Sequence, residues 1–340
     1  MKRSVYLFMT MVALFTICTP LIAQKKKDGQ EKRDADYFNW EKSKLIPKLK
    51  KLAITELTVN YKLTTTAKTI VQEKGTGNIA GARVSAYLEF IDSDPTSDDF
   101  QGITDHFYRY FQTKLKANGI DTVGWNEVVA SDFYQKIGDN GKDDSEKVRS
   151  GNKWVASTAN KGKIVHSGQD GFAGGKAKRA ESFAKEFGTG ASFKVTVDFA
   201  DVVVNMDIKT TARKDVYNDQ RGTVWYYPEV TKQKYTWGVH AEMMVGNQDN
   251  KQWTYIWGTK GWPEFLFQWS DIPVDGSYAE SMTEDVSKTR GTVASLVAFR
   301  KELTPVLVRT TREKYIAAAK HAVEKWVDAF VERAVSMRDN

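Results

Sequence analysis

The chain has 340 residues, of which 41% are hydrophobic and 27% charged, with only 7 prolines. This composition excludes a disordered, a collagen-like and a polytopic membrane protein, and the length allows one large domain or two ordinary ones. The formal net charge of +7 belongs to the N-terminal region, because from residue 52 onward the chain has 38 basic and 38 acidic residues. We therefore expect no nucleic-acid partner.

Residues 1–23 have the layout of a secretory signal peptide: a basic start, a mostly apolar run and a cleavage point after Ala23. The single cysteine, Cys18, lies inside this run, so the mature chain has no disulfide; the residue before Cys18 is not small, which argues against a lipid anchor. A secreted chain of this size without cysteine favours a Gram-negative envelope, either periplasmic, outer-membrane-associated or secreted. An uncleaved anchor is the alternative, because lysines at 25–27 follow the run.

The first folded part is predicted over residues 52–137, behind a basic tether at 24–51 that is either solvated or in contact with an anionic surface. Alternating apolar residues predict half-buried strands at 57–63 and 84–90, joined by a glycine-containing connection. Apolar residues at helical spacing predict a helix that begins near Ser97 and ends at Asn118. A strand is expected at 120–129, so this part is an α/β half.

Glycine marks the next segment, residues 138–192, because ten of the 24 glycines lie between 138 and 190. We expect a mobile surface excursion there, with one short helix at 176–187. An antiparallel β-meander is predicted over 193–275, with strands at 193–212, 235–245, 252–257 and 265–269. The apolar positions change phase at Ala200 and Asp201, which predicts a bulge or a bend.

Helices are predicted for the C-terminal segment, residues 289–340. One should span 292–303, and a second should begin at Pro305 and reach Met337. The second helix has an apolar stripe that favours packing on the sheet, with a partner-binding face as the alternative. The predicted fold class is therefore α+β: a mixed or antiparallel sheet flanked by helices, with a Trp-rich β-meander and a long C-terminal helix. Whether residues 289–340 form one domain with 52–275 stays open.

Aromatic residues are concentrated between residues 225 and 269, where twelve of 45 positions are Trp, Tyr or Phe, against 12% for the whole chain. Flat amphipathic rings on a sheet are suited to stacking on sugars or to anchoring a protein partner. The alternative is that they are cross-strand pairs in the core of an ordinary meander. The candidate binding residues are Trp225, Tyr226, Tyr227, Trp253, Tyr255, Trp257 and Trp262.

No catalytic, metal or cofactor motif is complete. The glycine-rich segment 171–177 lacks the first glycine and the hydroxyl residue of a phosphate loop, and two Ser-x-x-Lys matches lack their companion motifs. His240 and Glu242 could provide two metal ligands, but a catalytic zinc needs three from the protein. We therefore expect no metal, no cofactor and no catalytic residue, although carboxylates that belong to no motif leave room for an enzyme.

The segment from Phe100 to Val123, followed by Trp125 to Tyr134, resembles the helix-then-strand unit of the curli-channel (CsgG-like) and TolB N-terminal group of periplasmic α/β domains. The resemblance covers about residues 97–137 and implies a non-enzymatic envelope role in assembly, anchoring or transport. It transfers no site residues.

The expected function is that of an exported, non-enzymatic envelope protein that binds a protein or glycan partner, without an integral membrane span after cleavage. Its oligomeric state is open. The alternative is a carboxylate-dependent enzyme that acts on an envelope glycan. Such an enzyme would hold two carboxylates about 5–10 Å apart in a cleft.

Overall fold

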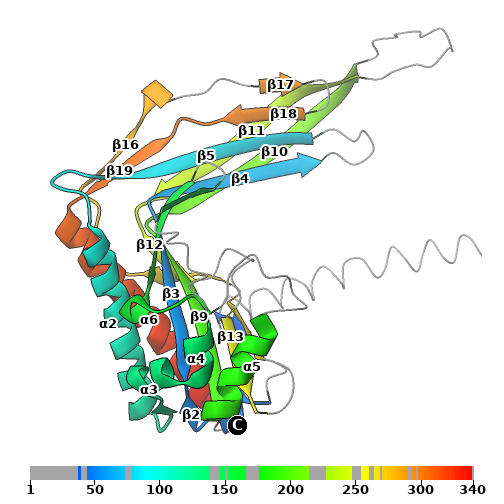
Figure 1. Ribbon diagram of the computed structural model, residues 1–340. Coiled ribbons are helices and arrows are strands. Elements are labelled where there is room, and N and C mark those ends of the chain that lie inside the picture. Colours follow the sequence, from blue (N-terminus) through cyan, green and yellow to red (C-terminus); the bar gives the residue numbers. More distant parts are fainter. Residues whose placement is uncertain are drawn as a thin grey trace, which may run out of the picture.

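Two large sheets divide the described chain into a helix-covered body and an elongated arm of long strands (Figure 1). The structure is a computed structural model that describes residues 37–39, 44–72, 79–137, 146–149, 152–165, 176–213, 227–246, 254–259, 264–268, 270–288, 293–295 and 298–338. All statements below concern these residues. Among them, no helix combines the length and the apolar character that crossing a membrane requires.

The body contains a mixed sheet of nine described strands, whose centre is a parallel pair, β3 (Ile54–Lys62) and β9 (Thr189–Asp198). Along its main path the order is β1-β14-β13-β9-β3-β8-β7, and β12 joins β15 to β9. The remaining strands of this sheet are β1 (Phe38–Asn39), β7 (Glu146–Arg149), β8 (Asn152–Thr158), β12 (Met243–Gly246), β13 (Thr254–Gly258), β14 (Glu264–Gln268) and β15 (Ile272–Val274). A small parallel pair, β2 (Lys51–Leu52) and β6 (Asp121–Thr122), lies beside it.

Helices cover both faces of the body sheet (Figure 1). On one face, α2 (Ser97–Ala117) and α6 (Arg312–Arg338) bury the large core, in which Phe111, Phe193 and Trp326 meet edge to face. On the other face, α3 (Trp125–Ala130), α4 (Asp132–Lys136) and α5 (Lys176–Phe187) enclose a smaller core around Phe183. Single 3₁₀ turns lie at Ile46–Lys48, Ala159–Lys161 and Val286–Lys288.

The arm is a six-stranded sheet on which a long hairpin packs. The sheet contains β4 (Thr64–Gln72), β5 (Ile79–Phe90), β16 (Ser281–Glu284), β17 (Val293–Ser295), β18 (Ala298–Glu302) and β19 (Val306–Thr310). The hairpin is β10 (Asp201–Arg213) with β11 (Tyr227–His240). Small side chains of β5, including Ala80 and Ala82, pack with Val204 and Met206 of β10, so the two layers share an apolar core.

The α+β class is confirmed, with mixed sheets, flanking helices and a long C-terminal helix. The predicted helix at 97–118 is α2, which begins at the Thr96 cap and is followed by Gly119 with φ of +72°. A left-handed φ favours glycine at the end of a helix. The predicted helix at 176–187 is α5. The stripe of α6 packs on the sheet, and its members Ala319, Val323, Trp326 and Phe330 are fully buried.

Three expectations for the first half were wrong. The strand at 57–63 is not half-buried, because both faces of β3 are covered. The connection between 63 and 84 contains a further strand, β4, which pairs along its whole length with β5. Residues 120–129 form a strand only at β6 (Asp121–Thr122), because Gly124 caps the helix α3 and its N–H donates to the Glu127 side chain.

Further expectations were wrong because long-range pairing overrides local pattern. The excursion at 138–192 contains β7 and β8, which belong to the body sheet. By contrast, of the bulge and the bend predicted at Ala200 and Asp201, the structure has the bend, since β9 ends in the body and β10 begins in the arm there. The meander is split in the same way, because β11 belongs to the arm. Residues 292–303 are not a helix but include β17 and β18, and the helix expected from Pro305 begins only at Arg312, after β19.

Candidate functional site

The chain passes between body and arm several times at one place, which we call the elbow. Its connections include residue 63 between β3 and β4, residues 91–96 between β5 and α2, residues 199–200 between β9 and β10, and residue 311 between β19 and α6. Figure 1 shows all of these crossings at the same end of the arm. Pockets lie preferentially where two structural units meet, so the elbow is where a site is expected first.

Asp198 lies at the end of β9 and joins three strands at the elbow. One of its oxygens accepts from Lys62 Nζ at 2.9 Å and from Thr65 Oγ1 at 3.0 Å, and the other accepts from the Ala200 N–H at 3.4 Å. Burial raises the pKa of Asp198, while Lys62 and the two other donors act in the opposite direction. The network therefore holds β3, β9 and the start of β4 together.

Glu56 forms a second buried network on the same face of the body sheet. Its carboxylate accepts from Thr58 Oγ1 at 3.0 Å and from Ser192 Oγ at 3.1 Å, and Lys194 Nζ lies 3.5 Å away. The strand register pairs Glu56 with Ser192, six residues before Asp198 on β9. At a rise of about 3.3 Å per residue, the two carboxylates are about 20 Å apart, too far for the pair of a glycosidase.

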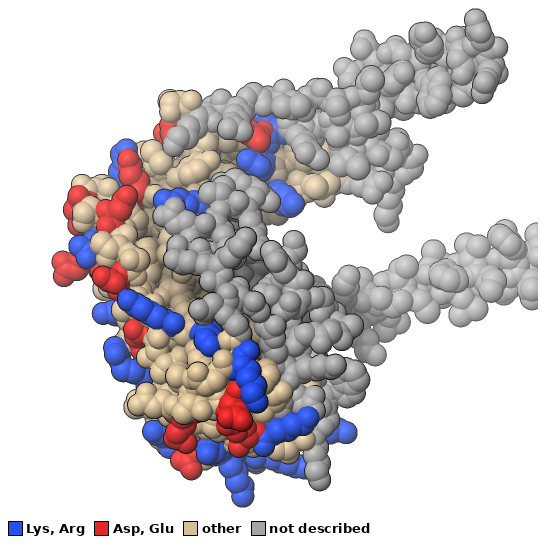
Figure 2. Space-filling model, viewed as in Figure 1, with Lys and Arg blue, Asp and Glu red and all other residues tan. Residues whose placement is uncertain are grey.

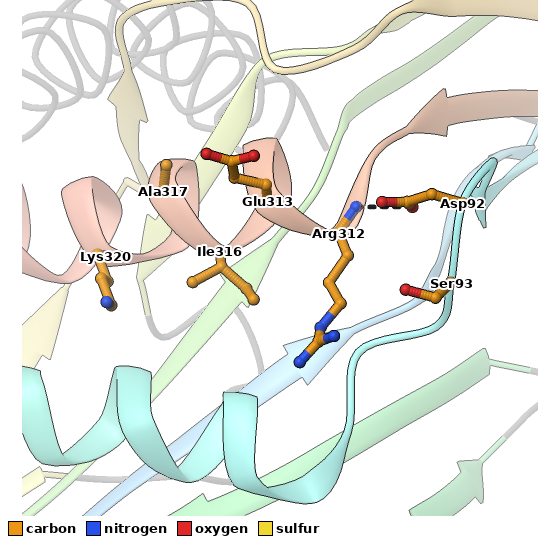
Figure 3. A pocket seen from close by; sticks show the side chains of 7 residues that line it. All are labelled: Asp92, Ser93, Arg312, Glu313, Ile316, Ala317 and Lys320. Carbon is orange, nitrogen blue, oxygen red and sulfur yellow. Dashed lines mark hydrogen bonds between the residues drawn. The ribbon is translucent and has the colours of Figure 1, made fainter.

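Arg312, the first residue of α6, connects the two long helices at the elbow (Figure 3). Its Nε and Nη2 atoms donate to the two oxygens of Asp99 at 2.8 Å each, and its backbone N–H donates to Asp92 Oδ1 at 3.0 Å. This guanidinium is the main reason that the pKa of Asp99 falls to about 2. Asp99 also closes the capping box of Thr96, as expected for carboxylates at a helix start.

Two pockets, each of about 470 Å³, open beside this connection. The first lies between Ser93, Arg312 and the first turns of α6 (Figure 3), and of its two cations, Arg312 and Lys320, the first is paired with Asp99. The second is lined by aromatic, aliphatic and polar side chains, among them Leu63, Tyr87, Phe100, Lys153 and two carboxylates, Glu89 and Asp94. Of these carboxylates, Glu89 is paired with Arg309 at 2.6 Å.

The predicted aromatic binding residues do not come together as a surface within the described chain. Trp225, Tyr226, Trp253 and Trp262 lie outside the described residues. Tyr227 begins β11. Tyr255 is half-buried, and Trp257, only 5% exposed, packs on Ala184 of α5. Trp257 is therefore a core residue, and the face of β13 that carries it is covered by a helix.

The two possible metal ligands, His240 and Glu242, stand at the end of β11 and just after it. Among the described residues, no three His, Cys, Asp or Glu side chains are grouped closely enough to hold a metal ion. Sequence reasoning missed the Asp198 and Glu56 networks, since an alternating polar face looks the same whether it is solvated or covered.

No protein-family model, no curated protein and no solved structure matches the chain. The resemblance of residues 97–137 to the curli-channel and TolB group therefore stays a prediction.

Proposed function

We propose that the chain is an exported, non-enzymatic protein of a bacterial envelope that binds a protein or glycan partner through its arm and elbow. The observation that carries this proposal is the distribution of exposed large hydrophobic side chains. Within the described residues there are five, and all lie on the arm or at the elbow: Ile70, Ile91, Val203, Met282 and Val286. A contiguous exposed apolar patch marks an interaction site, and we propose that these side chains contribute to one.

The charges of the described residues support a binder over an enzyme. Asp198, Glu56, Asp99 and Glu89 each face a cation within 3.6 Å, which holds them as structural groups. On the face of the body that Figure 2 shows, basic and acidic side chains are intermixed. A partner would therefore recognise shape, apolar groups and backbone hydrogen bonds more than a field of one sign.

Export is proposed from the signal-like layout of residues 1–23. Intact-mass measurement on the chain purified from envelope fractions of the native host tests it. Loss of residues 1–23 supports export with cleavage. A mass that retains them would support an anchor instead, and recovery from the cytoplasm would contradict the proposal.

Binding is tested by photo-crosslinking in living cells. A photoreactive residue is placed at Ile91, which is 56% exposed at the elbow, and at Met282, which is 47% exposed on the arm. The matched control is Arg109, an exposed position in the middle of α2 on the body. We expect one defined protein or glycan adduct from the first two positions and none from Arg109. Adducts that are equal at all three positions would contradict the proposed surface.

A further inference from the structure

The outer edge of β4 is the longest strand edge of the arm sheet that no described strand covers. β4 pairs only with β5, through nine successive residue pairs without a register shift, and Figure 1 shows it along the margin of the arm. Thr64 and Thr65 are buried at the elbow, whereas every residue from Thr66 to Val71 is half-buried or exposed. In an antiparallel pair, about every second residue directs its N–H and C=O away from the partner strand.

Most features by which proteins protect a free edge are missing from β4. The strand is nine residues long, has no proline and no bulge, and six of its residues are β-branched. Protected edges are short, bent or interrupted, because a long regular edge is a template for another strand. The one protective feature is Lys68, which is exposed. A single lysine does not prevent another strand from pairing with β4, but it favours a strand that carries an acidic side chain opposite it.

The charge that an added strand should carry opposite Lys68 follows from the register of the strands in the arm sheet. Lys68 stands directly opposite Arg83 of β5, and Arg83 stands opposite Glu302 of β18, with which it forms an ion pair of 3.6 Å. Across this face of the sheet, Glu302, Arg83 and Lys68 therefore follow one another on neighbouring strands. Among the described residues, no carboxylate forms an ion pair with Lys68. Like charges on neighbouring strands repel, so an acidic residue in a strand added beyond β4 would relieve this repulsion.

Two residues after Lys68, on the same face of β4, Ile70 favours an apolar side chain in the added strand. Ile70 is 60% exposed, although its β-branched side chain is suited to a cross-strand contact. Side chains two apart on a strand share a face, so a strand that places an acidic residue opposite Lys68 also places a residue opposite Ile70. Burial of Ile70 by an apolar side chain there would add stabilisation.

We propose that the edge of β4 binds an extended segment of a partner protein by strand addition, with an acidic side chain opposite Lys68 and an apolar one opposite Ile70. This inference rests on the proposed binding function and specifies the partner as a protein segment. The segment carries its acidic and apolar residues two positions apart, in the order that parallel or antiparallel pairing requires.

The test uses the purified mature chain and two capped soluble peptides, one centred on Thr-Glu-Thr-Val-Thr for parallel pairing and one on Thr-Val-Thr-Glu-Thr for antiparallel pairing. Each has a matched peptide with Lys in place of Glu and another with Pro in place of the central Thr. The order that binds more tightly is called the Glu peptide below. Binding is followed by hydrogen exchange of the amides in β4. We expect the Glu peptide to slow exchange at residues 67–71 and to bind about tenfold more tightly than the Lys peptide. The Pro peptide should not bind.

Reversing the charge at position 68 shows whether β4 recognises the charge of the peptide or pairs with any extended peptide. Lys68→Glu should invert the preference, so that the Lys peptide binds more tightly, whereas Arg109→Glu, a matched reversal on α2, should change nothing. Ile70→Thr should weaken binding of the Glu peptide and keep its preference over the Lys peptide. No slowing of exchange in β4, or slowing that ignores the peptide's charge, would overturn the proposal.

Two other outcomes would overturn this inference while leaving the proposed function standing. If the chain alone associates and protects β4, the occupant is a second copy. If photo-crosslinking captures a partner but Lys68→Glu leaves that capture unchanged, the partner binds elsewhere. Absence of any adduct, with the Glu peptide still bound at β4, would instead count against the proposed function alone.

Discussion

Replacing Lys62 by methionine tests whether its ammonium allows a charged Asp198 at the elbow. The two groups are 2.9 Å apart, and their side chains are 13% and 6% exposed. Methionine keeps most of the apolar stem of lysine, so the main change is the loss of the charge. Asp198 then retains only the Thr65 hydroxyl and the Ala200 N–H among the donors described above. Breaking a buried pair from one side costs about 3–5 kcal/mol of unfolding free energy.

The pH dependence of this loss has a definite sign. Burial raises the pKa of Asp198 in the folded protein, so the folded state binds the proton more tightly than the unfolded state. The stability linked to this group is fully present below the unfolded pKa and is lost as the pH rises through the folded pKa. Removing Lys62 raises the folded pKa further. The Lys62→Met variant should therefore lose more stability at about pH 8 than at about pH 5.

Urea unfolding followed by circular dichroism at both pH values measures the effect. Lys62→Met with Asp198→Asn removes both charges and should recover much of the loss, because the asparagine oxygen still accepts from Thr65. The matched control is Lys136→Met, whose side chain is 76% exposed beside Asp132 and whose loss should stay within about 0.5 kcal/mol. A loss below about 1 kcal/mol for Lys62→Met, or an equal loss at both pH values, would refute the reasoning.

Three further outcomes are expected. Trp257→Ala should reduce the unfolding free energy by about 3–5 kcal/mol in urea unfolding, because the ring is buried. Asp99 has a pKa lowered to about 2, so its stabilising pairing is present above its ordinary pKa of 3.8 and is lost as the pH falls through about 2. Arg312→Gln should remove much of this loss of unfolding free energy in acid. The expected difference is about 1 kcal/mol, because water screens the partly exposed pair, and acid-unfolding curves measure it. Thr96→Ala should cost about 1 kcal/mol of thermal stability through loss of the α2 cap.

Elements with local signals were predictable from the sequence. α2 begins at a capping box and ends before a glycine with positive φ, both of which depend on residues next to each other in the chain. α5 was predicted with its observed bounds. The stripe of α6 indicated its buried face correctly, because the helical period alone determines which residues align.

Elements that depend on distant partners were not predictable in the same way. β18 lies in a parallel pairing with β5, whose residues are more than 200 positions earlier, and a helical interpretation of 292–303 contains no information about that strand. The Lys62 and Asp198 pair joins residues 136 positions apart. Period-two alternation in β3 revealed its two faces, but not that both are covered.

The phase change at Ala200 shows how one correct observation left two interpretations open, a bulge and a bend. A bulge and a passage between two sheets both reset which residues face the core, so the pattern alone does not separate them. Here β9 packs its odd-numbered residues Phe193, Val195 and Val197 in the body core, and β10 packs even-numbered Val204 and Met206 in the arm core. The change of phase in the apolar pattern therefore coincides with the passage of the chain from the body to the arm at the elbow.

The position of Asp198 leads to a last prediction that connects the elbow with the edge strand. β4 begins two residues after Lys62, and Thr65 of β4 donates to the Asp198 carboxylate, as Lys62 does. The buried Lys62–Asp198 pair therefore holds the first residues of β4, where the chain enters the arm. If this anchor determines how rigidly β4 is held, Lys62→Met should weaken binding of the Glu peptide although Lys68 and Ile70 are unchanged, because a looser strand loses more entropy on pairing. Titration at about pH 5, where the variant is least destabilised, keeps the protein folded during the measurement. Lys136→Met again provides the control, and an affinity equal to that of the unmodified chain would mean that pairing with β5 alone determines the position of the edge.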